Sequence, residues 1–363
     1  NGCTTADFHL TNQQLQMKIL ITGGCGFIGS HAASYFRDQG HQVVVLDNLS
    51  RCGTEGNLEW LRQTGEIEHS PADIRYWDQI DKALSQHTDT EAVLHLAAQV
   101  AVTTSVTDPV NDFEINATGT FNMLEGARKH LPNLKMFVYS STNKVYGGLE
   151  DGELELKNDR WGLSNRPNGI SETEQLDFHS PYGCSKGAAD QYVRDYSRIY
   201  DIPTVVLRQS CIYGTRQFGV EDQGWVAWMT IAAMTHQQIT VYGDGKQIRD
   251  LLWVEDLVKL YELCVENPDK ANGQAFNTGG GPTNTLSLLE LLNFLAEREG
   301  RDLGLKFDEE RPGDQKVFVS NNTKLKEILG WKPTTSVDQG LEQLAQWISN
   351  NREVIVSFKK KAA

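Results

Sequence analysis

One segment, from Lys18 to Asn48, constrains the fold more than any other part of the chain. It begins with the apolar run KILIT, passes through a glycine-rich turn and continues as the amphipathic stretch FIGSHAASYFRDQ, which ends at Gly40. A second apolar run, HQVVVLDN, follows at once. Short apolar runs rich in β-branched residues, on either side of a helix, predict two parallel strands joined by a crossover helix.

The turn itself, Thr22 to Gly29, predicts a dinucleotide site. Gly23 permits a tight turn, Gly26 allows the backbone to approach a pyrophosphate, and Gly29 lets the helix pack closely on the strand. The N-terminus of the helix that follows can then hold the phosphates. A glycine pattern alone is weak evidence, but this one lies between a strand and a helix, as the motif requires.

Asp47, at the end of the second strand, indicates which dinucleotide is bound. Its carboxylate can accept hydrogen bonds from the adenosine ribose hydroxyls, and it would repel a 2′-phosphate at short range. NAD is therefore expected rather than NADP. Arg51 follows closely in sequence and is open to two interpretations, a group that accommodates a phosphate or a solvated loop charge.

Strands and helices continue to alternate through the first half of the chain. Apolar runs that predict buried strands lie at 91–98, 134–141 and 203–208. Stretches that predict helices lie at 110–130 and 182–200. This order predicts an α/β fold with a doubly wound parallel sheet and right-handed crossovers, the Rossmann arrangement.

The alternation weakens after about residue 214, which predicts a smaller, mixed C-terminal lobe over the carboxyl ends of the strands. We expect the dinucleotide domain to occupy mainly 17–213, with a return segment near 246–275. The substrate lobe should then comprise 214–245 and 276–350. Residues 1–16 are polar and lack a signal-peptide apolar stretch, so we expect a disordered leader before Met17.

Composition excludes several classes of function. The formal net charge is -14, with 48 acidic and 34 basic residues, which argues against a nucleic-acid partner. The nine histidines form no spaced ligand set, so no metal is expected. The six cysteines are scattered, which favours reduced thiols and a cytoplasmic protein. No apolar run reaches the length of about 18 residues that predicts a membrane span, so no membrane partner is expected.

Tyr182 and Lys186 lie four residues apart at the start of a predicted helix, on one helical face. Tyrosine has an ordinary pKa of about 10, so a nearby positive charge is needed to favour the phenolate at neutral pH. Lys186 can supply that charge. Thr142 lies at the carboxyl end of the strand predicted at 134–141, where its hydroxyl could hydrogen-bond a substrate hydroxyl undergoing oxidation. We therefore predict these three residues as the catalytic set.

Together these motifs resemble the extended short-chain dehydrogenase/reductases that act on nucleotide sugars. The resemblance rests on the glycine turn, HLAAQ (95–99), Asn116, SSTNKVYG (140–147) and YGCSK (182–186). It implies that Tyr182 is the catalytic base, that Lys186 is its partner, and that Thr142 is the residue that binds the reacting hydroxyl. The partner it implies is a nucleotide-diphosphate sugar.

The resemblance also implies two sets of ligand-binding residues. The cofactor set is Gly23, Gly26, Phe27, Ile28, Asp47, Asn48, Asp73, Ile74, Leu96, Ala97, Ala98, Asn116, Tyr182 and Lys186. The substrate set is Gln99, Thr142, Asn143, Arg208, Gln217, Arg249 and Arg311. Within it, Arg249 and Arg311 are expected to bind the diphosphate, with surface salt bridges as the alternative. Trp225 and Trp228 either stack on the base or belong to the core.

The residues after Thr142 help to separate the chemistries of this family. Its 4,6-dehydratases have an Asp-Glu pair there, whereas Asn143 cannot carry a proton and Lys144 reverses the charge. A dehydratase is disfavoured, while a 4-epimerase stays open. Further similarity points to the CDP-tyvelose 2-epimerase group, also called CDP-paratose 2-epimerases. It rests on STNKVYG, PNG (167–169), the segment 175–192 and DQGW (222–225), although Gln209 replaces the histidine expected in that group.

The second resemblance implies inversion at C2 of a CDP-3,6-dideoxyhexose, in the synthesis of lipopolysaccharide sugars. A ketone at C4 of such a sugar would acidify C3 and C5 but not C2, so C2 itself must be oxidised and reduced again. Two alternatives within enzymes are a nucleotide-sugar 4-epimerase and a dehydrogenase that releases NADH. A non-catalytic NAD-binding sensor is the alternative from another class. The family also implies a homodimer or homotetramer.

Overall fold

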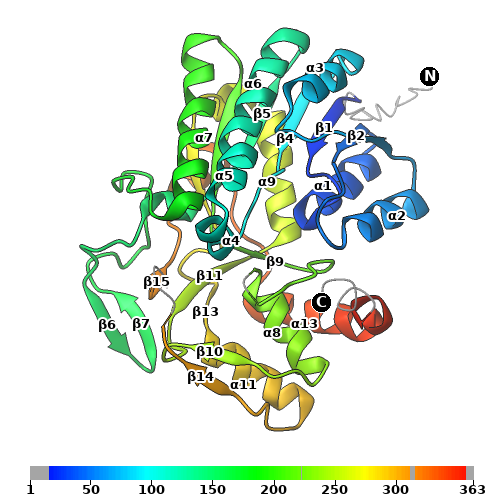
Figure 1. Cartoon of the computed structure of the whole chain (residues 1–363). Coiled ribbons are helices and arrows are strands. Elements are labelled where there is room, and N and C mark those ends of the chain that lie inside the picture. Colours follow the sequence, from blue (N-terminus) through cyan, green and yellow to red (C-terminus); the bar gives the residue numbers. More distant parts are fainter. Residues whose placement is uncertain (1–15, 222, 311–314, 357–363) are drawn as a thin grey trace, which may run out of the picture.

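The computed structural model describes residues 16–221, 223–310 and 315–356. Seven parallel strands form one central sheet in the order β12-β8-β5-β4-β1-β2-β3 (Figure 1). The strands are β1 (Lys18–Thr22), β2 (Gln42–Leu46), β3 (Glu68–Ser70), β4 (Ala92–His95), β5 (Met136–Thr142), β8 (Thr204–Gln209) and β12 (Ala275–Thr278). The predicted leader lies outside the described residues, apart from Gln16.

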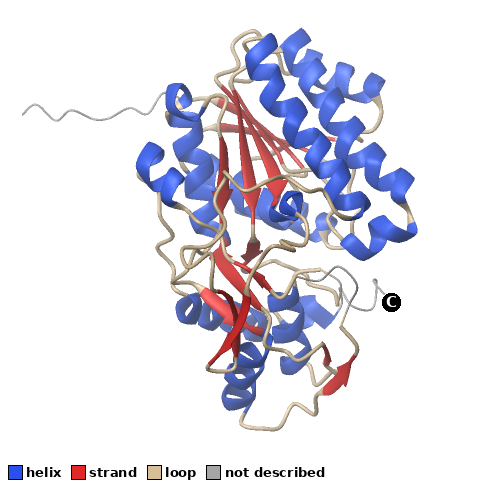
Figure 2. Cartoon of the chain, turned by 90° about the vertical axis from the view of Figure 1, so that its left-hand side faces the viewer, coloured by secondary structure: helices blue, strands red, loops and turns tan. Residues whose placement is uncertain are grey.

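Helices cover both faces of this sheet (Figure 2). On one face lie α1 (Phe27–Asp38), α2 (Thr54–Thr64) and α9 (Val254–Glu266), and on the other lie α3 (Trp77–Gln86), α6 (Gly119–His130) and α7 (Ser180–Ile199). Successive side chains of a strand point to opposite faces. Accordingly, Ile19 and Ile21 pack with α1, while Leu20 packs in the cluster on the other side. Because both faces are covered, the strands are apolar almost throughout.

The strand order reverses at β1, since β2 and β3 lie on one side of it and β4, β5, β8 and β12 lie on the other. In doubly wound sheets the ligand binds outside the carboxyl ends of the strands, at the point of reversal. The loops after β1, β2 and β4 therefore define where a site is expected.

A smaller lobe lies beyond the carboxyl ends of the strands (Figures 1 and 2). Its central strand β11 (Ile248–Trp253) pairs antiparallel with β13 (Thr285–Ser287) and parallel with β15 (Val317–Phe318) and β9 (Cys211–Tyr213). The helices α8 (Trp225–Met234), α11 (Leu288–Glu299) and α13 (Val337–Asn350) pack with it around a second core. The mixed pairing matches the mixed lobe expected from the sequence.

The remaining elements are short. They are α4 (Val102–Thr107), α5 (Pro109–Phe113), a π-helix (Glu114–Thr118), a 3-10 helix (Asn143–Tyr146), β6 (Leu154–Lys157), β7 (Arg160–Leu163), β10 (Thr240–Tyr242), α10 (Pro268–Ala271), β14 (Lys306–Asp308) and α12 (Thr323–Leu329). No helix in the described ranges is both long and apolar enough to span a bilayer.

The predicted doubly wound α/β fold with a mixed C-terminal lobe is confirmed. The predicted return segment near 246–275 divides between the two parts of the molecule. Its first strand, β11, belongs to the lobe sheet, whereas α9 packs on α1 in the core of the dinucleotide domain. The strand that returns to the central sheet is β12, which pairs with β8 at the end of that segment.

Candidate active site

A cavity of about 590 Å³ lies at the carboxyl ends of the central strands. Its walls come from the glycine turn after β1, the loops after β2 and β4, the end of β5, the start of α7 and the lobe segment from Gln209 to Trp225. This is the place that the reversal of strand order predicts. Predicted cofactor residues and the predicted catalytic residues line this one cavity.

The glycine turn leaves the start of α1 open to this cavity. Gly23 has a φ of +65°, and a Cβ there would lie 2.8 Å from the backbone nitrogen of Ala97. A Cβ on Gly29 would lie 2.1 Å from the carbonyl oxygen of Gly23, which is closer than packing allows. Gly26 precedes α1 and lines the cavity without a side chain. The turn therefore fits the backbone approach that a dinucleotide pyrophosphate requires.

The cofactor residues predicted at the adenosine end lie together along the cavity. They are Asp47, Asn48, Asp73 and Ile74. The carboxylate of Asp47 accepts hydrogen bonds from the backbone nitrogens of Cys25 at 3.0 Å and Leu49 at 2.8 Å. Burial raises its pKa above the ordinary value, although both hydrogen bonds oppose the rise. Asp47 thus links the glycine turn to the loop after β2, in a position that fits a ribose-binding carboxylate.

Two arginines connect the lobe to the cofactor side of the cavity. Arg51 lines the cavity from an exposed position and donates a hydrogen bond to the side chain of Gln223, and its role toward a phosphate stays a prediction. From the lobe, Arg216 donates to the side-chain oxygen of Asn57 at 3.0 Å. Asn57 in turn donates to the carbonyl of Cys25, within the glycine turn, at 3.0 Å. The lobe is therefore attached to the turn that would hold the pyrophosphate.

The loop after β4 forms another wall of the cavity, with Leu96, Ala97 and Ala98 along it. The hydroxyl of Thr22 accepts hydrogen bonds from the backbone nitrogens of Leu96 and Ala97, both at 3.1 Å. His95 hydrogen-bonds the same hydroxyl at 2.7 Å. Burial lowers the pKa of His95 to about 3, so its ring is neutral and holds the loop in place without adding charge.

Thr142 and Tyr182 meet at the far end of the cavity, as the sequence predicts. Thr142 ends β5, and its hydroxyl accepts a hydrogen bond from the backbone nitrogen of Lys144 at 3.2 Å. A hydrogen bond also joins the side chains of Tyr182 and Thr142. Burial raises the pKa of Tyr182 to about 12, and the bond to Thr142 opposes that rise. The phenol is therefore protonated at neutral pH in the protein alone.

Lys186 lines the same cavity but is held by other groups. Its ammonium donates to the carbonyl oxygen of Ser140 at 2.5 Å and lies 4.3 Å from the centre of the Tyr139 ring. Burial lowers the pKa of Lys186 to about 7. Among the described residues, no hydrogen bond joins this ammonium to Tyr182. That Lys186 tunes the phenol of Tyr182 stays a prediction.

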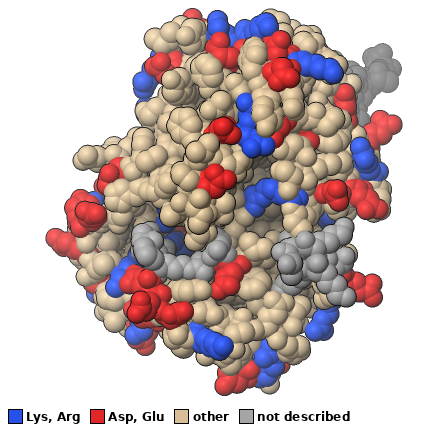
Figure 3. Space-filling view, viewed as in Figure 1, with Lys and Arg blue, Asp and Glu red and all other residues tan. Residues whose placement is uncertain are grey.

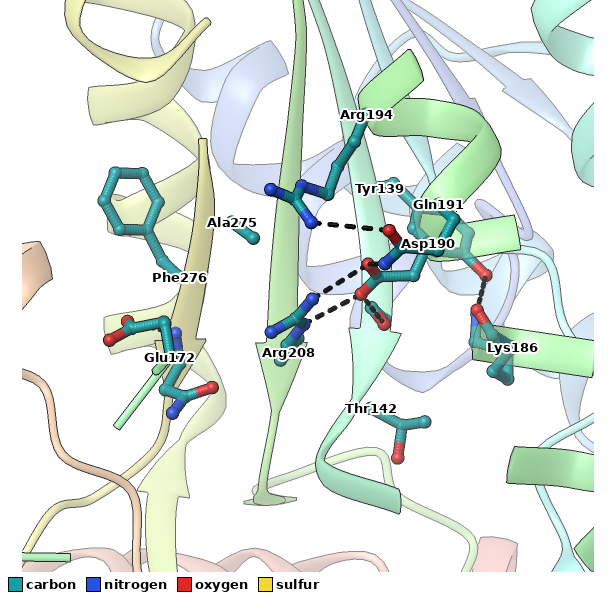
Figure 4. A network of polar contacts seen from close by, with 12 residues as sticks. Tyr139, Thr142, Glu172, Lys186, Asp190, Gln191, Arg194, Arg208, Ala275 and Phe276 are labelled. Atoms are coloured by element: carbon teal, nitrogen blue, oxygen red, sulfur yellow. Dashed lines mark hydrogen bonds and ion pairs between the residues drawn. The ribbon is translucent and has the colours of Figure 1, made fainter. Parts of the chain in front are cut away.

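Arg208, which was predicted to bind the substrate, lies in the core and does not contribute to the cavity wall. Figure 4 shows Arg208 pointing from β8 toward Asp190 on α7. Its guanidinium bonds both carboxylate oxygens of Asp190, at 3.0 and 3.1 Å, and the hydroxyl of Tyr146 at 2.9 Å. The two side chains are 3% and 0% exposed, so the pair lies in the core beneath the site. An arginine whose donors are used in the core is a structural residue.

The other predicted substrate residues separate into several groups. Gln99 and Gln217 line the cavity, but the side-chain amide of Gln99 is bonded to Ala101 and to Asp112. Asn143 and Arg249 do not contribute to the cavity wall. Arg311 lies outside the described residues.

Two further predictions concern residues beside the cavity. Asn116, predicted to contact the cofactor, is buried behind the wall and acts on it by accepting from the backbone nitrogen of Gln99 at 3.0 Å. Of the two tryptophans, Trp225 lines the cavity and donates to the sulfur of Cys211, whereas Trp228 packs against the lobe core. Trp225 also packs against the lobe core, so both tryptophans have the core role, and stacking of either on a nucleotide base stays a prediction.

Sequence reasoning missed a buried carboxylate directly behind the catalytic residues. Asp112 accepts a hydrogen bond from Ser185, which lies between Tyr182 and Lys186 on α7. The four-residue spacing of Asp112 and Asn116 was a signal that both lie on one helical face. In the structure the Asn116 amide donates a hydrogen bond to the Asp112 carboxylate at 3.1 Å. No pattern in the chain indicated that this face turns toward α7.

Figure 3 shows how charged side chains are distributed over one face of the molecule. On the face seen in Figure 3, Lys and Arg side chains are interspersed with Asp and Glu side chains. A basic patch is the expected footprint of a nucleic-acid partner. Within the described residues, no group of three or more His, Cys, Asp or Glu side chains is arranged to hold a metal ion.

Comparison with known proteins agrees with the fold and with the arrangement of this cavity. Residues 20–344 match the family model described as GDP-mannose 4,6 dehydratase. The chain therefore belongs to this family, which is part of the extended short-chain dehydrogenase/reductases. Proteins of this class include nucleotide-sugar epimerases and dehydratases.

Individual relatives narrow the comparison. The CDP-paratose 2-epimerase of Salmonella typhi is 44% identical over 339 residues, which cover 92% of this chain and all of the relative. The crystal structure of UDP-glucose 4-epimerase from Thermotoga maritima with UDP-glucose is 31% identical, with a TM-score of 0.79 over 92% of this chain and 99% of that one. The Thermus thermophilus UDP-glucose 4-epimerase in complex with NAD is 29% identical, with a TM-score of 0.76 and the same coverage.

Proposed function

We propose that this protein is an NAD-dependent epimerase that inverts C2 of a CDP-3,6-dideoxyhexose, converting CDP-paratose to CDP-tyvelose. The observation that carries the proposal is the placement of Thr142, Tyr182 and Lys186 in one cavity with the glycine turn. Identity of 44% with a CDP-paratose 2-epimerase over nearly the whole chain supports this choice of substrate. The Asp47 carboxylate at the ribose end of the cavity supports NAD over NADP.

The catalytic residues have separate tasks in this reaction. The glycine turn and Asp47 would hold NAD, which would supply the hydride acceptor and donor for the oxidation and re-reduction of C2. Tyr182 accepts the proton of the C2 hydroxyl and later returns it, while Thr142 donates a hydrogen bond that orients the reacting oxygen. The Lys186 ammonium stabilises the phenolate that Tyr182 forms. Each group returns to its starting state, so one turnover leaves no net oxidation.

The diphosphate end of the substrate has to stay fixed while the sugar rotates between oxidation and reduction. Arg249 and Arg311 are the proposed ligands of the diphosphate, because guanidinium groups form paired hydrogen bonds to phosphate oxygens. Gln217 is the proposed ligand of the sugar, and its position on the lobe side of the cavity wall supports this role. We assign Gln99 a supporting role instead, since its amide is already bonded within the protein.

Two competing enzyme activities are less well supported. A 4,6-dehydratase needs an acid/base pair after Thr142 to carry protons. Asn143 and Lys144 do not form such a pair. A 4-epimerase has the same catalytic residues, and the Thermotoga structure shows that the fold accommodates one. The alternatives therefore differ in which sugar carbon is oxidised.

A label at C2 separates these reactions. With CDP-paratose deuterated at C2, we expect a C2-inverted product that keeps its deuterium, because the same hydride returns to the carbon it left. Mass spectrometry and proton NMR of the product in ordinary water and in D2O measure retention and solvent exchange. A 4-epimerase would leave the C2 configuration unchanged, and a dehydrogenase would place the label in released NADH. Loss of the label to water would contradict oxidation at C2.

The proposal also covers the oligomeric state of the protein and its location in the cell. We expect a homodimer or homotetramer, since the outer face of the helices from α5 to α7 exposes large apolar side chains: Val110, Phe113, Phe121, Tyr192 and Ile199. Sedimentation of the purified chain measures the state. A cytoplasmic place in lipopolysaccharide sugar synthesis fits the nucleotide-sugar substrate, and no disulfide joins any two of the described cysteines.

A further inference from the structure

Asp112 is a fully buried carboxylate that neutral donors hold from three directions. It lies on α5 and is 0% exposed. One oxygen accepts from the side-chain amides of Gln99 at 2.8 Å and Asn116 at 3.1 Å, and the other accepts from the hydroxyl of Ser185 at 2.5 Å. Neutral hydrogen bonds leave the negative charge in place. A buried charge is costly unless an opposite charge lies near it.

The cation whose charge acts on Asp112 is Lys186, which is also buried without a salt bridge among the described residues. Its hydrogen-bond partner is the carbonyl of Ser140, and the face of the Tyr139 ring lies beside it. Both contacts favour an ammonium, but neither carries a full negative charge. Lys186 therefore also needs a counter-charge from elsewhere in the core.

Two buried carboxylates lie near Lys186, and one of them is already used. Asp190 follows Lys186 by one helical turn, but Arg208 bonds both of its oxygens (Figure 4). Among the described residues around Lys186, the buried carboxylates are Asp112 and Asp190, and the other buried cation is Arg208. Asp190 still favours the Lys186 ammonium, but Arg208 is bonded to it, so Asp112 is the buried carboxylate near Lys186 that has no ion pair among the described residues.

The other titratable groups around Lys186 do not change this balance. They are Tyr182 on α7, Tyr139 on β5 and His95 on β4. Burial holds both tyrosines protonated and His95 neutral at neutral pH, so none of them is charged. Arg51, on the loop after β2, is a charged group that acts on Tyr182 from the cofactor side. Asp112 is the buried carboxylate beside the pair that no cation bonds among the described residues.

We propose that Asp112 is a positioning residue that supplies the buried counter-charge for Lys186 and, through its bond to Ser185, fixes the turn of α7 that carries both Tyr182 and Lys186. Ser185 lies between the two catalytic side chains, so a bond at this position restrains both of them. Asn116 also donates to Ser185, at 3.1 Å, and closes the network against the loop after β4.

The sign of the electrostatic effect can be worked out. A nearby negative charge favours the ammonium of Lys186 and disfavours the phenolate of Tyr182, so Asp112 raises both pKa values. Removing the charge should lower both. Loss of the Lys186 proton would then begin at lower pH, and the alkaline limb of the kcat profile should move in the same direction.

The first experiment compares Asp112→Asn with Ser185→Ala across a pH series and rests on the proposed function. Asn keeps the shape and loses the charge, whereas Ala at 185 keeps the charge and loses the bond. We expect Asp112→Asn to move the alkaline limb down by about one to three pH units, the range for a nearby opposite charge. Ser185→Ala should lower kcat without that movement. A uniform loss of kcat at every pH in Asp112→Asn would overturn the electrostatic role.

The second experiment needs no substrate and so fails independently of the proposed function. Urea midpoints are measured at pH 6 for Lys186→Met, Asp112→Asn and the double variant. Lys186→Met leaves Asp112 without a counter-charge, so we expect Asp112→Asn to raise the midpoint in that background and to lower it in the wild type. Asp190→Asn is the matched control and should lower the midpoint in both, because it strands Arg208. Equal lowering by Asp112→Asn in both backgrounds would overturn the pairing.

Discussion

Replacing Tyr182 by Phe should reduce turnover of CDP-paratose by about a hundredfold or more while NAD stays bound. The change removes one hydroxyl, which hydrogen-bonds Thr142 and is the group that exchanges the substrate proton. Positioned acid/base catalysis is typically worth about 10²-fold to 10⁴-fold. Burial raises the pKa of Tyr182 to about 12, so the wild-type rate depends on a phenol that ionises with rising pH, and the residual rate of the variant should lack that rise.

Tyr213→Phe is the matched control for this substitution. Tyr213 is a buried tyrosine of the lobe whose hydroxyl bonds the carbonyl of Val337, away from the cavity wall. Its loss should leave turnover nearly unchanged, which separates loss of a catalytic hydroxyl from loss of any buried hydroxyl. Initial rates and the NAD content of the purified proteins are measured side by side. Turnover of Tyr182→Phe within about tenfold of wild type would refute its role as the base.

Arg208→Met should destabilise the fold by about 3–5 kcal/mol, the range for breaking one side of a buried ion pair. Asp190 is 0% exposed, and the substitution leaves its carboxylate without a cation. The hydroxyl of Tyr146 loses a donor in the same step. Urea unfolding followed by circular dichroism measures the change in the free energy of unfolding.

A double variant, Arg208→Met with Asp190→Leu, tests whether the loss comes from the stranded charge. Replacing both partners by apolar side chains often recovers much of the stability. We expect the double variant to be more stable than Arg208→Met alone. If Arg208 instead bound substrate, Arg208→Met would unfold like the wild type and show a raised KM.

The sequence was sufficient for the fold because its strongest signals are local. The run KILIT, the glycine turn and the helix that follows are neighbours in the chain, and their backbone geometry is set by neighbouring residues. Buried parallel strands also read as continuous apolar runs, which made β4, β5 and β8 visible. The cofactor residues next to the turn followed from the same local pattern.

The groups beneath the site could not be predicted in the same way, because they depend on contacts between distant segments. Arg208 follows an apolar run at the end of a strand, and in sequence alone that position suits a substrate ligand as well as a core residue. Its partner Asp190 lies on another element. Asp112 and Ser185 are 73 positions apart, and only the packing of α5 on α7 brings them together. Spacing along the chain carries no information about such pairs.

The attachment of the lobe to the cofactor side of the cavity has a consequence for the exchange of NAD between the enzyme and its surroundings. Arg51 bonds Gln223, and Arg216 reaches the glycine turn through Asn57, so these contacts join the lobe to the loops that would surround a bound dinucleotide. We expect such a molecule to behave as a permanent part of the enzyme that is never exchanged with the surrounding pool. The rate of sugar inversion would then be insensitive to the ratio of NADH to NAD in the cell, and the protein would work equally well in starved and in well-fed cells.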